Sequence, residues 1–196
     1  EEARVRLKLS QVWFVPARVS PLKLEHTASS AIDRLEMVRL AIADNPSFRV
    51  SRSDLEREGP SFTVDTLRSI AAQVGPQAQL FYIMGMDSLD TLARWREPQE
   101  IIRLARIVVV NRPGISADWD TLERAIPGLR AVTTVIDSVN LGISSTDIRT
   151  RVQQNWPIRY LVPPAVETFI RQRKLYLAAD VPQSARARDA HPTGLP

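Results

Sequence analysis

Apolar residues are grouped along this chain in two ways. Short apolar runs recur, each closed by a proline, a glycine or polar residues, and such runs are typical of buried strands. The predicted strands cover residues 12–15, 80–84, 107–110 and 132–136, and residues 48–50 read as the start of another. Elsewhere the apolar residues recur every three or four positions, which predicts amphipathic helices between the strands.

Several of these helices carry start and stop signals. Ser29 and Ser30 can cap a helix that runs toward residue 45, and Thr63 can cap one that Gly75 ends. The first helix would bury Ile32, Leu35, Val38 and Ile42, and the second Leu67, Ile70 and Val74. Further helices are predicted over residues 86–94, 98–104, 119–126, 145–153 and 164–173.

Strands that alternate with helices predict an α/β fold with a mostly parallel sheet. In such folds ligands bind at the carboxyl ends of the strands. We therefore expect one rim to gather the polar residues that follow the strands: residues 16–23, Gly85 with Asp87, Arg112, and residues 144–146.

The two ends of the chain also carry information. Residues 1–8 read as the end of a helix, so we expect an upstream strand and loop to be missing from the sequence; the alternative is that the chain naturally starts here. Residues 181–196 are rich in Pro, Ala and Arg without periodicity. We expect one domain over residues 1–177, N-terminally truncated, and a disordered tail over 178–196.

The composition of the chain excludes several kinds of catalytic site, metal site and partner. The chain has 196 residues, a net charge of +4, no cysteine and only two histidines, His26 and His191. Disulfides, thiolate nucleophiles and Cys-ligated zinc are therefore excluded. With only two histidines, a metal site built from His or a Ser-His-Asp triad is not expected. The basic residues form no cluster, so nucleic acid is not expected as a partner. Neither a signal peptide nor an apolar span of membrane length is present, so no membrane partner and a cytoplasmic location are expected.

The most informative segment is residues 143–149. Ser144, Ser145 and Thr146 stand at a predicted helix start, where backbone N–H groups and hydroxyls favour anions. Arg149 can lie on the same side of the first helical turn as these hydroxyls, and its guanidinium can bind a phosphate through two N–H groups. An ordinary helix cap followed by a surface arginine is the equal alternative.

Other residues at the expected rim suit a nucleotide. Lys23 could contact phosphate, and Asp87, just after Gly85, could accept from ribose hydroxyls or instead cap the next helix. Trp95 could stack on a flat ring, or it could be a core tryptophan. No nucleophile-plus-base pair accompanies them, so positioning and charge stabilisation would carry the chemistry.

Four blocks together resemble bacterial nicotinate-nucleotide adenylyltransferases, which are members of the nucleotidyltransferase superfamily. The blocks are residues 15–23, the run Gly-Pro-Ser-Phe-Thr-Val-Asp-Thr-Leu at 59–67, residues 83–95 with Gly-Met-Asp and Trp, and residues 143–149. The segments Val-Val-Val-Asn-Arg-Pro-Gly at 108–114 and Tyr-Leu-Val-Pro at 160–163 follow in family order. The resemblance covers residues 1 to about 176 and implies a Rossmann-like nucleotidyltransferase fold.

The resemblance also implies a reaction and a site. The phosphate of nicotinate mononucleotide would attack the α-phosphorus of ATP, with Mg²⁺ present, to give deamido-NAD and pyrophosphate. By matching position, ATP would be bound by Lys23, Gly85, Asp87, Ser144, Ser145, Thr146 and Arg149. Thr63 and Trp95 would bind the nicotinate nucleotide, with the ring carboxylate read by backbone N–H groups around Trp95. No protein ligand to metal is implied, and a homo-oligomer is left open.

Two departures from the family pattern matter. The opening signature G-G-T-F-D-P-I-H-x-G-H, which follows the first strand and supplies two histidines to the ATP phosphates, is absent, so no catalytic residue can be assigned. The usual Pro-Pro-His-Lys run reads Ser-Pro-Leu-Lys at residues 20–23, which looks like tolerated variation. We expect residues 1–196 alone to be inactive and poorly folded, and the complete gene product to be active.

Three alternatives stay open. The protein could be a related adenylyltransferase that acts on nicotinamide mononucleotide or on pantetheine phosphate. It could be a non-catalytic nucleotide-binding remnant that has lost its histidines. It could also be an interaction module, which would leave the phosphate-suited residues unexplained.

Overall fold

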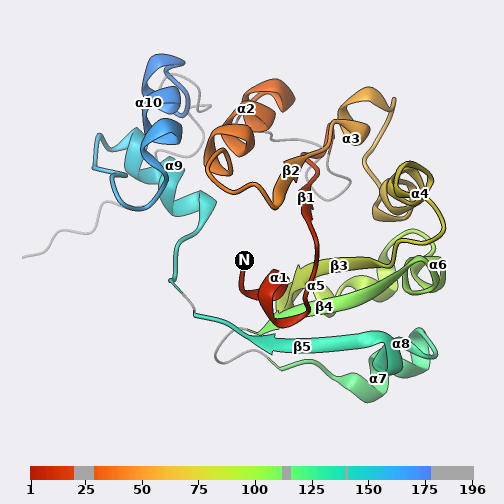
Figure 1. The fold of residues 1–196 in the computed structure, drawn as a ribbon. Coiled ribbons are helices and arrows are strands. Elements are labelled where there is room, and N and C mark those ends of the chain that lie inside the picture. Colours follow the sequence, from red (N-terminus) through yellow and green to blue (C-terminus); the bar gives the residue numbers. More distant parts are fainter. Residues whose placement is uncertain (20–28, 112–115, 140, 178–196) are drawn as a thin grey trace, which may run out of the picture. The chain divides into compact units, whose positions relative to one another are not determined.

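A computed structural model describes residues 1–19, 29–111, 116–139 and 141–177. The chain divides into two compact units (Figure 1). The first unit consists of Glu1–Thr27 and Ala31–Gly142, and the second of Ala28–Ser30 and Ile143–Pro196. The predicted single domain and the predicted disordered tail stay predictions, and the tail lies outside the described residues.

The larger sheet of the first unit is parallel and has the order β3-β4-β5. Its strands are β3 (Leu80–Gly85), β4 (Ala105–Asn111) and β5 (Thr133–Asp137). Tyr82 pairs with Ile107, and Val109 pairs with Val135. The predicted parallel α/β architecture is thus observed, and the central strand is the one with the longest β-branched run.

Strand β4 is buried on both faces. Ile107 and Val109 point into a core that also contains the fully buried Leu89 and Ile101, whereas Val108 points to the other face, where Ala3 and Ile136 complete a smaller cluster. Since successive residues of a strand face opposite sides, a run without polar interruption is what two covered faces require.

Helices on each side provide this cover. The main core is built by α4 (Thr63–Val74), α5 (Met86–Leu89), the 3-10 turn η1 (Leu92–Arg94), α6 (Pro98–Leu104), α7 (Trp119–Ala125) and α8 (Leu129–Val132). Helix α1 (Glu2–Arg6) packs Ala3 against the opposite face. The predicted helix over residues 86–94 is therefore two short turns, and α8 was not predicted.

A second, smaller sheet pairs β1 (Val12–Phe14) with β2 (Phe48–Val50), again in parallel. Phe14 and Phe48 meet edge to face, with their ring centroids 5.2 Å apart. Helix α2 (Ala31–Ala41) lies between these strands in sequence and packs on β2, and α3 (Ser53–Glu56) follows β2.

Two predictions about helix faces and caps were wrong. Ile32, expected in the core, is 61% exposed, while Asp33 is buried. Helix α2 packs on a three-residue strand, which is too small a surface to cover the whole predicted apolar face. Thr63 is the first helical residue of α4, and Phe62 occupies the N-cap without a side-chain bond. Gly75 ends α4 at a positive φ of 82°, as predicted.

The second unit contains α9 (Ser145–Gln153) and α10 (Pro164–Gln172). Its buried apolar residues are Ile148, Ile158, Val166 and Ile170. Tyr176 donates its hydroxyl to Ser29 Oγ at 3.2 Å, which ties the short stretch before α2 to this unit. In the described parts of the chain, no helix combines the length and the apolar composition that crossing a membrane requires.

The sandwiched position of β4 gives a stability prediction. Ile107→Ala should lower the free energy of unfolding by about 2–5 kcal/mol, because the cavity left between two covered faces cannot collapse fully. Arg106→Ala, at an exposed position on the same strand, should stay within about 0.5 kcal/mol of wild type. Urea denaturation measures both, and equal effects of the two substitutions would contradict the packing described here.

Candidate active site

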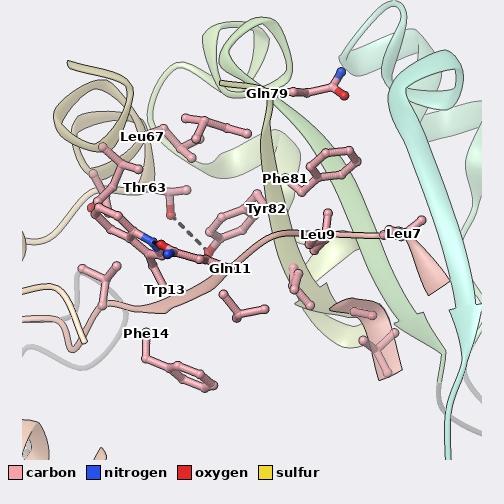
Figure 2. A pocket seen from close by; sticks show the side chains of 18 of the residues that line it. Leu7, Leu9, Gln11, Trp13, Phe14, Thr63, Leu67, Gln79, Phe81 and Tyr82 are labelled. Carbon is pink, nitrogen blue, oxygen red and sulfur yellow. Dashed lines mark hydrogen bonds between the residues drawn. The ribbon is translucent and has the colours of Figure 1, made fainter. Parts of the chain in front are cut away.

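A large pocket of about 1350 Å³ opens in the first unit. It is lined from three directions, by β1 with Trp13, by the start of α4 with Thr63, and by β3 with Tyr82 (Figure 2). Pockets that hold drug-sized ligands usually measure about 300–1,000 Å³. This pocket therefore has room for a ligand larger than a single ring system.

An aromatic wall forms one part of the pocket. The rings of Tyr82 and Trp95 meet edge to face, with centroids 6.0 Å apart and planes at 83°. Trp95 donates its Nε1–H to Thr91 Oγ1 at 3.1 Å, which fixes the indole while it packs against the core. Trp95 is thus both a core residue and a pocket residue, so the two interpretations of the sequence are not exclusive.

Thr63 belongs to the same wall. Its hydroxyl oxygen lies 3.5 Å from the Tyr82 hydroxyl, and Figure 2 shows this pair at the pocket surface. Burial is the main cause that raises the pKa of the Tyr82 phenol above its usual value, and the negative charge of Asp54 acts in the same direction. Tyr82 therefore presents a neutral hydroxyl to the pocket over the whole physiological range.

Positive charge lies beside the aromatic wall. Arg94 and Arg96, on either side of Trp95, both line the pocket. Arg96 lies over the Phe62 ring at 4.9 Å and within 3.5 Å of an Asp65 carboxylate oxygen. The backbone N–H of Trp95 donates to the Leu92 carbonyl at 3.0 Å, so this one N–H group is already bonded within the turn. The recognition of a ring carboxylate by the N–H groups around Trp95 stays a prediction.

Gly85 and Asp87 stand together at the carboxyl end of β3. A Cβ atom on Gly85 would lie 2.5 Å from Asp87 Oδ1, so only glycine lets the Asp87 carboxylate fold back over the backbone here. Gly85, not Asp87, holds the N-cap position of α5, so the capping interpretation of Asp87 was wrong. At the ends of the next two strands, Asn111 Nδ2 donates to Asp137 Oδ1 at 2.8 Å.

The hydroxyl-rich segment opens helix α9 in the second unit. Ser144 is the N-cap, and its Oγ accepts from the Asp147 N–H at 3.0 Å. Arg149 Nη2 donates to Thr146 Oγ1 at 3.1 Å, so arginine and hydroxyl share one side of the first turn as predicted. The side chains of Ser145 and Thr146 are exposed. Capping is therefore the observed role of Ser144, and it leaves the neighbouring hydroxyls at a helix start.

The predicted site residues fall into separate groups. Thr63 and Trp95 line one pocket, and Gly85 and Asp87 lie in the same unit, whereas residues 144–149 belong to the second unit. Lys23, His26, Arg112 and His191 lie outside the described residues. The expectation that all these residues share one rim stays a prediction.

The sequence analysis missed Trp13, Phe62 and Tyr82 as pocket residues. Each sits in or beside a predicted element, but no local motif marks an aromatic residue as lining a cavity instead of filling a core.

Comparison with known proteins decides the family. A family model described as cytidylyltransferase-like matches residues 1–151. A Herpetosiphon aurantiacus protein named probable nicotinate-nucleotide adenylyltransferase is 45% identical over 178 residues, covering 91% of this chain and 89% of that protein. A Roseiflexus castenholzii protein of the same name is 46% identical, over 90% and 87%. The chain belongs to the nicotinate-nucleotide adenylyltransferase family.

Solved structures extend the comparison to the fold. The nicotinic acid mononucleotide adenylyltransferase of Plasmodium falciparum, complexed with NaAD, matches with a TM-score of 0.65 over 85% of this chain and 82% of that chain. The same enzyme complexed with APC gives a TM-score of 0.63. The identities are 18% and 17%, so these matches show the fold. The Rossmann-like nucleotidyltransferase fold expected from the sequence is confirmed.

The raised pKa of Tyr82 predicts a pH dependence of stability. Above pH 10 the unfolded phenol ionises while the buried one keeps its proton, so stability should fall as pH rises. The slope from this one group can reach about 1.4 kcal/mol per pH unit. Tyr82→Phe should remove this part of the decline in chemical denaturation between pH 9 and 11. Tyr160→Phe, at an exposed residue, should not.

Proposed function

We propose that this protein transfers the adenylyl group of ATP to nicotinate mononucleotide; its relatives are named probable nicotinate-nucleotide adenylyltransferases. Their similarity over about nine-tenths of the chain carries the proposal. A phosphate oxygen of nicotinate mononucleotide forms a bond to the α-phosphorus of ATP, the bond from that phosphorus to the β-phosphate bridge breaks, and pyrophosphate leaves. The chain needs no nucleophile of its own for this step.

The aromatic pocket suits the pyridine ring of the acceptor. Trp95 offers a fixed indole, and Thr63 and Tyr82 offer hydroxyls at its edge. Arg94 adds positive charge, which favours a ring carboxylate over a neutral amide. The same features weigh against pantetheine phosphate, which has no ring for this wall to contact.

The segment at the start of α9 suits the phosphates of ATP. Its exposed hydroxyls, its first-turn N–H groups and Arg149 form a set of donors for anions. We assign Lys23 to the same phosphates, and Gly85 with Asp87 to the nucleoside, as the family resemblance implies. These donors would stabilise the negative charge that moves onto pyrophosphate.

Magnesium fits this scheme as a companion of ATP. Within the described residues, no group of three or more His, Cys, Asp or Glu side chains could hold a metal ion. Mg²⁺ commonly binds through substrate phosphates, several waters and one or two carboxylates. When bound it would neutralise negative charge on the phosphates of ATP.

We further propose that the pocket receives an extended segment that is not part of residues 1–196. In the described chain β1 pairs only with β2, and β3 pairs only with β4. The Val12 N–H donates to the carbonyl of Ser47, just before β2, and the Phe14 carbonyl accepts from the N–H of Ser51, just after β2, so the backbone of Trp13 between them points the other way. The occupant that we propose is the strand that precedes the two-histidine signature in the family pattern, because an extended segment could pair with this open edge.

The proposal predicts how activity depends on that segment. Residues 1–196 alone should release no pyrophosphate above background when given ATP and nicotinate mononucleotide. The chain extended ahead of Glu1 by a strand and the signature should be active, and replacing both added histidines by alanine should lower the rate about a hundredfold or more. Adenylyl transfer by residues 1–196 alone would refute this.

The ring pocket gives a second prediction. Trp95→Ala should weaken the binding of nicotinate mononucleotide about ten- to a hundredfold, since loss of one stacked aromatic ring costs about 1–3 kcal/mol. Isothermal titration calorimetry measures the dissociation constant. Trp95→Phe should keep most of the affinity, and Trp156→Ala, an exposed tryptophan of the second unit, should keep all of it. Equal binding by Trp95→Ala and wild type would refute the ring assignment.

A further inference from the structure

Asp54 is a buried carboxylate for which the proposed reaction has no use. Its side chain is among the few buried charged groups described, with 4% of the residue exposed. Thr66 Oγ1 donates to Asp54 Oδ1 at 2.6 Å, and Arg57 Nη2 donates to the same oxygen at 2.7 Å. Arg57 Nη2 also lies 3.3 Å from Thr66 Oγ1, so the three side chains close a triangle.

This triangle fixes the first turn of helix α4. The N-cap residue Phe62 makes no side-chain cap bond, so the turn lacks the usual local support. The Phe62 carbonyl accepts the first helical bonds from the N–H groups of Asp65 and Thr66, both at 3.1 Å. It also accepts from Thr66 Oγ1 at 3.2 Å, which is the bond that links it to the triangle. Asp54 therefore anchors, through Thr66, the turn that carries Thr63.

The segment between Arg57 and α4 also holds the chain that leads to Lys23. The Arg57 carbonyl accepts from Arg18 Nη1 at 3.3 Å, and the Arg18 N–H donates to Ser61 Oγ at 2.9 Å. The Ser61 N–H in turn donates to the Val19 carbonyl at 2.9 Å. Residues 18 and 19 are thus hydrogen-bonded to residues 57–61 at three points. The Asp54–Arg57 ion pair in turn holds the start of this segment.

We infer that Asp54 is a positioning residue that couples the ring pocket to residues 18 and 19. Asp54 lies in the wall of the same pocket. The effect proposed for it is indirect, through Thr66 on Thr63 and through Arg57 on residues 18 and 19. The ligand that depends on it is a nucleotide whose ring enters the aromatic pocket. This inference rests on the proposed function of that pocket.

Amide hydrogen exchange separates positioning from general stabilisation. In Asp54→Asn the Arg57 partner loses a charge-assisted bond, so exchange at Ser61, Asp65 and Thr66 should speed up about tenfold. Exchange at Ile101, whose N–H donates to the carbonyl of Glu97 at the start of α6, should stay unchanged. The matched control is Glu58→Gln, which removes an exposed charge four residues away.

The dissociation constant for nicotinate mononucleotide tests whether this positioning affects the pocket. Asp54→Asn should raise the dissociation constant for nicotinate mononucleotide about tenfold, and Glu58→Gln should leave it unchanged. Thr66→Val should weaken binding similarly, and the double variant should be little worse than Asp54→Asn alone, because both substitutions break one network.

Each contrary result has a definite meaning. Equal acceleration at Ser61 and Ile101, or no acceleration at either, would overturn the positioning role, and so would local acceleration with unchanged affinity. If the wild-type chain binds no nicotinate mononucleotide, the proposed function fails, while the exchange rates still decide whether Asp54 holds the first turn of α4.

Discussion

The rest of the first unit depends on the burial of strand β4 on both faces. Ile107 and Val109 complete the core beneath the helices, and Val108 completes the cluster beneath α1. Because both faces are covered, the backbone of β4 must be fully paired with its neighbours, and β3 and β5 provide that pairing. The carboxyl end of β3, with Gly85 and Asp87, takes its position from this arrangement.

The aromatic pocket is formed by residues that also pack against the core of this unit. Trp95 and Tyr82 each have one side against the core and one side on the pocket. Rigid packing therefore holds the ring surface in place, and a ligand would lose little of its binding energy to ordering these side chains. The start of α4 is less well supported locally, and the polar triangle around Asp54 compensates for the missing cap.

Both sheets of the first unit have an edge strand at the large pocket, and this bears on the family resemblance. Each has an edge strand, β1 or β3, at the large pocket, and open edges are normally covered or paired in folded proteins. A nucleotidyltransferase fold with a strand in this place would unite the sheets.

The sequence by itself determined the strands, most helices and the family. Unbroken apolar runs such as residues 107–110 can be read locally because burial on two faces leaves no polar position. The order of motifs led to the prediction of Thr63, Gly85, Asp87, Trp95 and residues 144–149 as site residues. Only the tertiary structure decided that Ile32 is exposed, that Asp87 is no cap, that Tyr82 and Trp13 line the pocket, and that Asp54 is buried in a network. Local patterns do not specify which distant segments face one another, and burial and hydrogen bonding between segments depend on that.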